Sequence, residues 1–223
     1  MKVNTDGVLL GAWMPAGMPS VLDVGTGTGV VALMAAQRGA GKVTAVELSA
    51  PAARTAARNA EASPWAGRVT VHCADFADFA SSTAERFDLI VSNPPYFSFL
   101  HSPDPVRDAT RHADALPAGV LMRGMARCLA SGGRCCIIVP ATARQDYVLE
   151  AAAAGLFLQH ETKVCTKAGK VPSRVLLEWT GHAPAACIRD TISVLGADGV
   201  PTPQFVALTQ DFYLNFPISD CPE

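Results

Sequence analysis

The sequence predicts an α/β protein: a doubly wound, mostly parallel seven-stranded sheet with helices on both faces and an antiparallel pair of strands near the C-terminus. Short apolar runs of strand length alternate with alanine-rich helical stretches along most of the chain, and this alternation is typical of β-α-β units. A glycine-rich turn follows the first apolar run, as in nucleotide-binding folds. Two later runs, at 157–164 and 175–179, are joined without a helix and are expected to pair antiparallel.

The composition is that of a globular protein with a well-buried core. The 223 residues are 49% hydrophobic and carry a formal net charge of −2, so we expect one domain over residues 1–223 and a monomer. The 7 cysteines show neither a C-x-x-C pair nor metal-ligand spacing, which favours a reducing cytoplasm and no metal. Polar residues interrupt the opening stretch, and apolar runs are short, so we expect neither a signal peptide nor a membrane span.

The expected elements follow in chain order. Residues 3–13 combine a polar turn with a helical run that Thr5 or Asp6 can cap. Strands are then expected over residues 21–24, 42–46, 69–72, 87–92, 134–139, 157–164 and 175–179, with one more short strand in the tail from residue 188. Helices are expected over residues 30–36, 50–62, 76–80, 114–130 and 145–154.

The glycine turn is Gly25, Gly27 and Gly29, preceded by Asp23 at the end of the first strand. Glycine permits positive φ and lets a ligand approach the backbone closely. The spacing is G-x-G-x-G, whereas a dinucleotide fingerprint has G-x-G-x-x-G, and no Gly-Lys-Ser/Thr of a P-loop follows. The turn therefore indicates a nucleoside-containing ligand rather than a nicotinamide dinucleotide.

Acidic side chains follow the next two strands. Glu47 closes the second strand, where a carboxylate can accept hydrogen bonds from vicinal ribose hydroxyls. After the third strand, Asp75 can accept from an adenine amine and Phe76 can flank the ring; Asp75 is equally suited to cap the following helix.

The fourth strand ends in Asn93-Pro94-Pro95-Tyr96. Two consecutive prolines stop a strand, because neither donates to the ladder and each restricts the residue before it. The loop presents the Asn93 amide oxygen, the Pro94 carbonyl and the Tyr96 ring at the edge where open α/β sheets bind ligands. Two fixed acceptors beside an aromatic ring suit a planar group that carries an –NH2.

A long loop follows, and long loops within compact domains are usually functional or mobile. We expect it to contact substrate through Pro95, Phe97, Arg107, Arg111 and His112. A second basic group, comprising Lys163, Lys167, Lys170 and Arg174, lies in the connection of the C-terminal strand pair; it is either a solvated hairpin or a phosphate contact.

These stretches resemble the Rossmann-like class I S-adenosylmethionine-dependent methyltransferases that carry an N-P-P-[YF] loop. Within that class the chain is most similar to the valine-tRNA adenine-37 N6-methyltransferase family. The matching segments run in order along the chain: KVNTDGVLLGAW, LDVGTGTG, AVEL, FDLIVSNPPY, RVLL and LTQDFYL. The NPPY and glycine motifs are shared by several methyltransferase groups, while TDGVLLGAW and LTQDFYL are narrower.

The resemblance implies a role for each matched residue. The three glycines line S-adenosylmethionine, Asp23 orders the turn, Glu47 binds the ribose, Asp75 the adenine, and Thr5 or Asp6 the methionine end. Asn93 and Pro94 hold the target amine, and Tyr96 stacks on the base, which implies a tRNA partner through its anticodon loop. Members of the family carry a further segment before KVNTDG; if that segment helps to grip RNA, its loss affects tRNA binding more than methyl transfer.

Three other functions remain open at this point. A glutamine side-chain amide is also planar and suits NPPY, so a protein glutamine N5-methyltransferase is the first alternative. A ribosomal RNA guanine-N2 methyltransferase is the second, and a non-catalytic S-adenosylmethionine-binding interaction protein is the third. The fold alone does not distinguish them.

Overall fold

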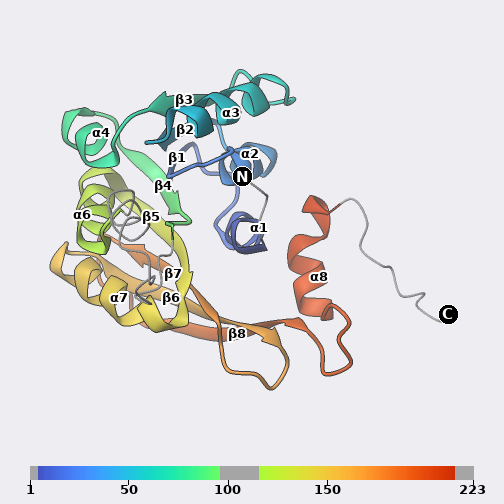
Figure 1. Cartoon of the computed structure of the whole chain (residues 1–223). Coiled ribbons are helices and arrows are strands. Elements are labelled where there is room, and N and C mark those ends of the chain that lie inside the picture. Colours follow the sequence, from blue (N-terminus) through green and yellow to red (C-terminus); the bar gives the residue numbers. More distant parts are fainter. Residues whose placement is uncertain (1–4, 96–115, 214–223) are drawn as a thin grey trace, which may run out of the picture.

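The computed structural model describes residues 5–95 and 116–213, and its centre is one eight-stranded sheet (Figure 1). The strand order is β3-β2-β1-β4-β5-β7-β6-β8. The strands are β1 (Ser20–Val24), β2 (Lys42–Glu47), β3 (Val69–Cys73), β4 (Phe87–Ser92), β5 (Leu129–Pro140), β6 (Phe157–Lys167), β7 (Arg174–Thr180) and β8 (Ile188–Leu195).

The first five strands form the parallel half of the sheet. Their order along the sheet runs outward from β1 in both directions, with β2 and β3 on one side and β4 and β5 on the other. β1 pairs with β2 on one side and with β4 on the other, β2 pairs with β3, and β4 pairs with β5, all in parallel. The point between β1 and β4 is therefore a topological switch point, where ligands bind outside the carboxyl ends of the strands in such sheets.

Helices cover both faces of the sheet, as the alternation of strands and helices requires (Figure 1). One hydrophobic core lies under the first two helices and α8, and includes Leu9, Met34 and Phe205. The other lies on the opposite face and includes Phe76, Met125 and Trp179. The helices are α1 (Thr5–Trp13), α2 (Val30–Gln37), α3 (Ala50–Glu61), α4 (Phe76–Ser82), α6 (Ala118–Cys128), α7 (Arg144–Ala153) and α8 (Pro203–Thr209), with short 3-10 turns η1 (Ala141–Ala143) and η2 (Gln210–Phe212).

The predicted fold class is confirmed, with one correction to the strand count. β7 pairs antiparallel with both β5 and β6, as expected of the C-terminal pair. The sheet nevertheless has eight strands and not seven, because β8 adds to the free edge of β6 in a parallel register. The tail strand expected from residue 188 is thus part of the main sheet.

The boundary between α6 and β5 also differs from the expected one. The sequence predicted a helix to Ala130 stopped by Gly132-Gly133, but α6 ends at Cys128 and β5 begins at Leu129. The pairing of β4 with β5 shifts register between Phe87 and Leu89. Gly133 is required at this irregularity, because a Cβ there would lie 2.9 Å from the Phe87 carbonyl oxygen.

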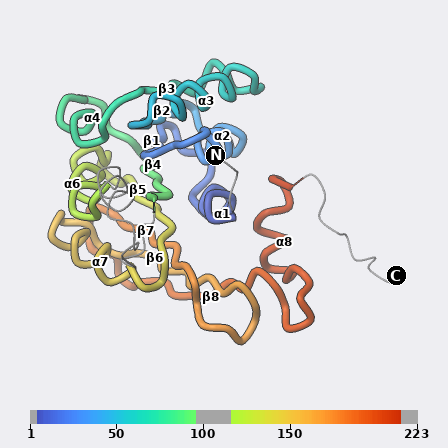
Figure 2. Tube along the Cα trace, in the orientation of Figure 1, coloured from blue at the N-terminus to red at the C-terminus, as the bar shows by residue number. Residues whose placement is uncertain are grey.

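The C-terminal helix returns to the start of the chain, and Figure 2 shows α8 beside α1. Thr202 caps α8 by accepting from the Phe205 N–H. The buried Phe205 ring joins the core under α1, and Phe212 packs against the same core. The segment from α8 to Phe212 therefore packs on the body of the protein. Within the described residues, no helix has the length and apolar character that crossing a membrane requires.

Candidate active site

The carboxyl ends of four neighbouring strands form one continuous edge. The pairs Val24–Ser92 and Val24–Val46 are in register, so Gly25 and Asn93 begin adjacent loops at the same level. The pair Glu47–Cys73 continues this edge to β3. The residues predicted from distant motifs are thus brought together by strand register.

The glycine turn has the backbone geometry that its sequence predicted. Gly25, Gly27 and Gly29 have φ angles of 70°, 58° and 87°, a region that L side chains rarely adopt. A Cβ on Gly25 would meet no atom within 4 Å, so the turn has open space on that side. The site therefore has room for a ligand next to the backbone.

Asp23 lies behind this turn and is 1% exposed. Its Oδ2 accepts a hydrogen bond from the Thr26 hydroxyl at 2.6 Å. Burial raises the pKa of Asp23 from 3.8 to about 6, against the lowering effect of hydrogen bonds from Thr26 and the Ala32 backbone, and the nearby Glu47 charge adds a smaller increase. Its carboxyl faces the interior of the loop, which fits a role in ordering the turn.

Glu47 is tied to the turn by two backbone amides. Its Oε2 accepts from the Gly27 N–H and its Oε1 from the Ser49 N–H, both at 2.8 Å. These bonds fix the carboxylate at the end of β2 beside the glycines. Each oxygen keeps further acceptor capacity, so the fixed carboxylate can also receive hydroxyl donors.

Asp75 caps α4, the structural role that the sequence left as an alternative. Its Oδ1 accepts from the N–H groups of Ala77 at 2.7 Å and Asp78 at 3.2 Å. The Phe76 ring is buried, and a Cβ on Gly124 of α6 would lie 2.5 Å from it. The Phe76 ring therefore packs against α6, and Asp75 follows β3 at the same edge of the sheet.

The start of the NPPY loop is anchored to the glycine strand. Buried Ser92 donates its hydroxyl to the Val24 carbonyl oxygen at 2.8 Å, across 68 positions in the chain. Asn93 is half-buried, Pro94 is buried and Pro95 is exposed. The anchor holds the first residues of this loop at a fixed position relative to the glycine turn.

On the other side of this loop, the first turn of α1 is joined to β7. Arg174 Nε donates to Asp6 Oδ2 at 2.8 Å, and Arg174 pairs in register with Pro140 at the end of β5. Thr5, the first residue of α1, is exposed. The contact brings Asp6 to the carboxyl edge and corrects the grouping of Arg174 with the hairpin lysines, since its guanidinium is bound to Asp6.

Sequence reasoning missed three supports of the site. Ser92 and Arg174 are described above, and Asn59 of α3 donates its amide to the Thr28 carbonyl of the glycine turn at 2.8 Å. None of them belongs to a pattern with a fixed chemical meaning, so only the tertiary structure identifies them. The predicted site residues Tyr96, Phe97, Arg107, Arg111 and His112 lie outside the described residues.

The donor set suits a nucleoside-containing cofactor. A positive-φ glycine turn, a carboxylate fixed beside it and a further carboxyl at the next strand can hold the backbone-facing, ribose and base portions of such a molecule. Among the described parts of the chain, no group of three or more His, Cys, Asp or Glu residues has the arrangement of a metal site.

Comparisons with known proteins agree with this geometry. A family model described as a methyltransferase domain matches residues 21–133. Among solved structures, a "predicted O-methyltransferase" from Agrobacterium tumefaciens has a TM-score of 0.72 at 20% identity, over 92% of this chain and 96% of that one. A ribosomal protein L11 methylase from Lactobacillus delbrueckii has a TM-score of 0.54 at 18% identity, over 78% and 76%. The chain therefore has the fold of the S-adenosylmethionine-dependent methyltransferases.

Curated relatives identify the family within this class. A tRNA1(Val) (adenine(37)-N6)-methyltransferase from Phocaeicola vulgatus is 41% identical over 217 residues, which cover 96% of this chain and 92% of the relative. An enzyme of the same name from Cronobacter sakazakii is 41% identical over 218 residues, with coverage of 96% and 89%. This chain belongs to the tRNA1(Val) (adenine(37)-N6)-methyltransferase family.

Proposed function

We propose that this chain, acting as one catalytic domain in the cytoplasm, methylates the exocyclic N6 amine of adenine 37 in a valine tRNA. The observation that carries the proposal is the register of β1 with β4, which starts the glycine turn and the Asn93-Pro94 loop at the same level of one sheet edge. Family membership at 41% identity over 96% of the chain supports the adenine substrate. The same identity favours the tRNA reaction over the glutamine, guanine and non-catalytic alternatives.

S-adenosylmethionine, when bound, supplies an electrophilic methyl group on its sulfonium. In this proposal Gly25, Gly27 and Glu47 hold its nucleoside; the open space at Gly25 and the two amides that fix Glu47 support this assignment. Asp75 Oδ2 is available for the adenine amine, and the start of α1 around Thr5 and Asp6 for the amino-acid end. Positioning of the two reactants is then the main contribution of the chain.

Asn93 and Pro94 act on the target amine. The lone pair of an adenine N6 amine is delocalised into the ring, which makes it a poor nucleophile. Two acceptors, the Asn93 side-chain oxygen and the Pro94 carbonyl, favour a pyramidal nitrogen and stabilise the positive charge that develops on it. Tyr96 is proposed to stack on the base. A base reaches such a pocket only when it is unpaired or flipped, which suits an anticodon-loop nucleotide.

The proposal is tested with S-adenosylmethionine labelled on its methyl group. The protein is given unmodified tRNA in one reaction and a cell protein extract in another, and the digested products are identified. We expect label in N6-methyladenosine. Label in glutamine of the extract, or in guanine, would replace the proposed reaction with the corresponding alternative.

A further inference from the structure

The outer end of the sheet carries a group of cations on one face. Glu161 of β6 pairs in register with Arg189 of β8, and the Arg189 Nε lies 3.8 Å from Glu161 Oε2. Side chains alternate between faces along a strand, so Lys163 and Lys167 share the face of Glu161. Lys170 follows in the hairpin between β6 and β7. We call Lys163, Lys167, Lys170 and Arg189 the basic strip.

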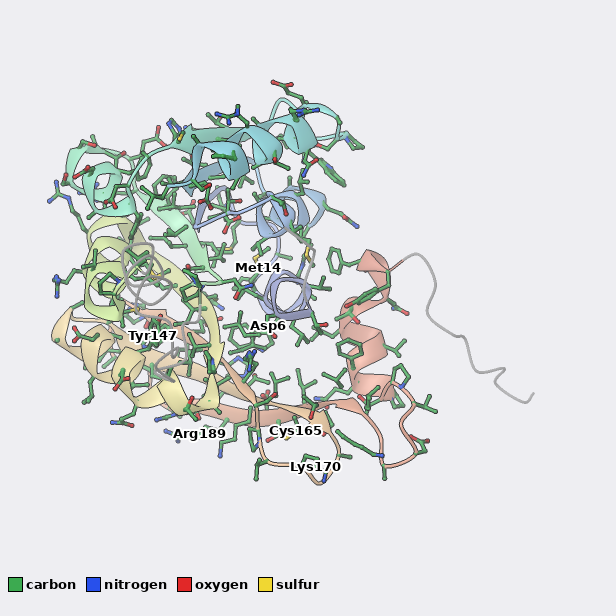
Figure 3. All side chains as sticks on the ribbon, in the orientation of Figure 1. Asp6, Met14, Tyr147, Cys165, Lys170 and Arg189 are labelled. Atoms are coloured by element: carbon green, nitrogen blue, oxygen red, sulfur yellow. The ribbon has the colours of Figure 1, made fainter. Side chains whose placement is uncertain are left out.

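Most side chains of the basic strip are exposed, although Cys165, between Lys163 and Lys167 on the same face, is buried. Lys163, Lys170 and Arg189 are exposed, as is Thr191, which pairs with Lys163. In Figure 3, Arg189, Cys165 and Lys170 are labelled along this end of the molecule. The four exposed residues named here carry amines, a guanidinium and a hydroxyl, which are groups that contact phosphates in nucleic-acid complexes.

The three lysines carry most of the uncompensated positive charge of the strip, because Arg189 lies within 3.8 Å of the Glu161 carboxylate. The buried Glu161 carboxylate is already bound on both oxygens by Arg144, with Nε–Oε1 at 2.9 Å and Nη2–Oε2 at 2.6 Å. Within the part of the chain that the structure describes, Lys163, Lys167 and Lys170 make no side-chain ion pair within 4 Å. A protein with a net charge of −2 therefore concentrates positive charge on this face.

The nearby acidic groups are directed elsewhere. Asp190 of β8 lies on the other face, where its Oδ2 is 3.1 Å from His160 Nε2. Asp198 accepts from the Val200 N–H within its own turn. Neither makes an ion pair with a residue of the basic strip.

The strip begins at the edge of the sheet that holds the candidate active site. The Ser173 carbonyl at the end of the hairpin accepts from the Ala141 N–H, directly after β5. β5 neighbours β4, which leads into Asn93. Adjacent strands lie about 4.8 Å apart, so the three steps from β4 to β6 span roughly 14 Å. An RNA whose base enters the site has its backbone within reach of this hairpin.

We propose that the basic strip binds the phosphate backbone of the RNA substrate and positions it on the β6–β8 side of the site. The proposal rests on the proposed function for the identity of the RNA. Charge alone would also serve to keep the edge strand β8 from pairing with other chains. Either positive or negative side chains could protect an edge strand. The residues of the strip are all positively charged, and the strip adjoins the candidate active site, which favours a phosphate contact.

The test is a triple variant, Lys163→Ala with Lys167→Ala and Lys170→Ala, in the full chain. A valine tRNA transcript is titrated by fluorescence anisotropy from about 50 to about 200 mM salt, where phosphate contacts dominate. We expect tRNA affinity to fall by at least about tenfold, and the slope of log K against log salt to decrease by roughly 2 to 3. The KM for tRNA should rise, with kcat at saturating tRNA and S-adenosylmethionine affinity nearly unchanged.

The matched control removes three exposed arginines at the opposite end of the sheet. Arg54→Ala with Arg58→Ala and Arg68→Ala changes the net charge equally and should leave the salt slope near that of the wild type. The single variant Lys170→Ala, in a turn of the hairpin, should lower the slope by about 1 and serves if the triple variant folds poorly.

The outcomes separate this proposal from the proposed function. Equal tRNA affinity of the triple variant and wild type, or an equal loss in the control, would overturn the role of the strip even if wild-type enzyme methylates tRNA. If the strip variants lose tRNA binding while wild-type enzyme transfers no methyl group to tRNA, the strip stands as an RNA-binding surface and the proposed reaction falls.

Discussion

At the scale of single residues, Glu47 is the contact on which we expect cofactor binding to depend most. Its two oxygens are held by the Gly27 and Ser49 amides, so no reorganisation is needed before ribose hydroxyls bind. Hydrogen bonds to charged groups contribute about 1.5–3 kcal/mol each. Glu47→Ala should therefore weaken S-adenosylmethionine binding by roughly 10-fold or more, measured by calorimetric titration.

A surface glutamate provides the control for Glu47. Glu85 is half-exposed and pairs with Lys42, away from the carboxyl edge, and Glu85→Ala should leave the affinity for S-adenosylmethionine unchanged. An unchanged affinity in Glu47→Ala as well would remove Glu47 from the site.

Asp23, behind the same glycine turn, makes the free energy of unfolding depend on pH. Its pKa is 3.8 ordinarily and about 6 in the folded protein, so folding favours the protonated carboxyl. The contribution of Asp23 to the free energy of unfolding is therefore greatest below its unfolded pKa and falls as pH rises to about 6, by up to about 3 kcal/mol. Asp23→Asn removes this change.

The prediction for Asp23 is a pH-dependent difference between two proteins. The quantity to compare is the free energy of unfolding of Asp23→Asn minus that of wild type. This difference should be larger at about pH 7 than at about pH 4, by up to about 3 kcal/mol. Urea unfolding of both proteins at each pH measures the difference. A difference in unfolding free energy that stays constant with pH would contradict the assignment.

At the scale of elements, the contact of α1 with β7 connects the cofactor side of the site to the C-terminal strand pair. Arg174 and Asp6 are separated by 168 positions, and their side chains are 32% and 19% exposed. Arg174→Ala should release the first turn of α1 and raise the KM for S-adenosylmethionine several-fold, with a smaller effect on kcat.

A double-mutant cycle checks that this effect passes through Asp6. Asp6→Asn, Arg174→Ala and the double variant are compared by their affinity for S-adenosylmethionine, and residues in contact should couple by about 0.5–3 kcal/mol. Strictly additive effects would show that Arg174 acts independently of Asp6.

The elements also show how far the sequence can be read. Strands β1 to β4 could be predicted closely, because each is a short run rich in β-branched and other apolar residues, and a Gly turn and a Pro-Pro pair end β1 and β4. The start of β5 could not, because Gly132 and Gly133 serve an irregular register that forms only against β4. β8 was expected as a strand but was not included in the predicted sheet, because its pairing with β6 is specified only by the tertiary structure.

The residues of the candidate site likewise divide into those that the sequence predicted and those that it did not. Gly25, Glu47 and Asn93 could be found because each has a fixed position after a strand, and strand register then brings them together. Ser92, Asn59 and Arg174 could not be found, because each acts on a backbone or side chain remote in the chain. Phe76 is buried and packs against α6, and its predicted place beside the cofactor stays a prediction.

At the scale of the whole molecule, the proposed site lies along one edge of the sheet, formed by the carboxyl ends of the parallel strands. The proposed cofactor-binding residues lie at the ends of β1 to β3, the proposed target-amine residues at the end of β4, and the basic strip on the far strands. The strand order fixes this sequence of functions in space. We therefore propose that the cofactor binds toward one end of the sheet and the RNA toward the other.

The most direct measurement maps the methyl group on valine tRNA by mass spectrometry of nuclease fragments, with wild type and Asn93→Ala compared. We expect N6-methyladenosine at position 37 with wild type and no product on a transcript with guanine at that position. Transfer by Asn93→Ala should be at least about 100-fold slower, with S-adenosylmethionine binding retained. Full turnover by Asn93→Ala, or a methyl group at another nucleotide, would contradict it.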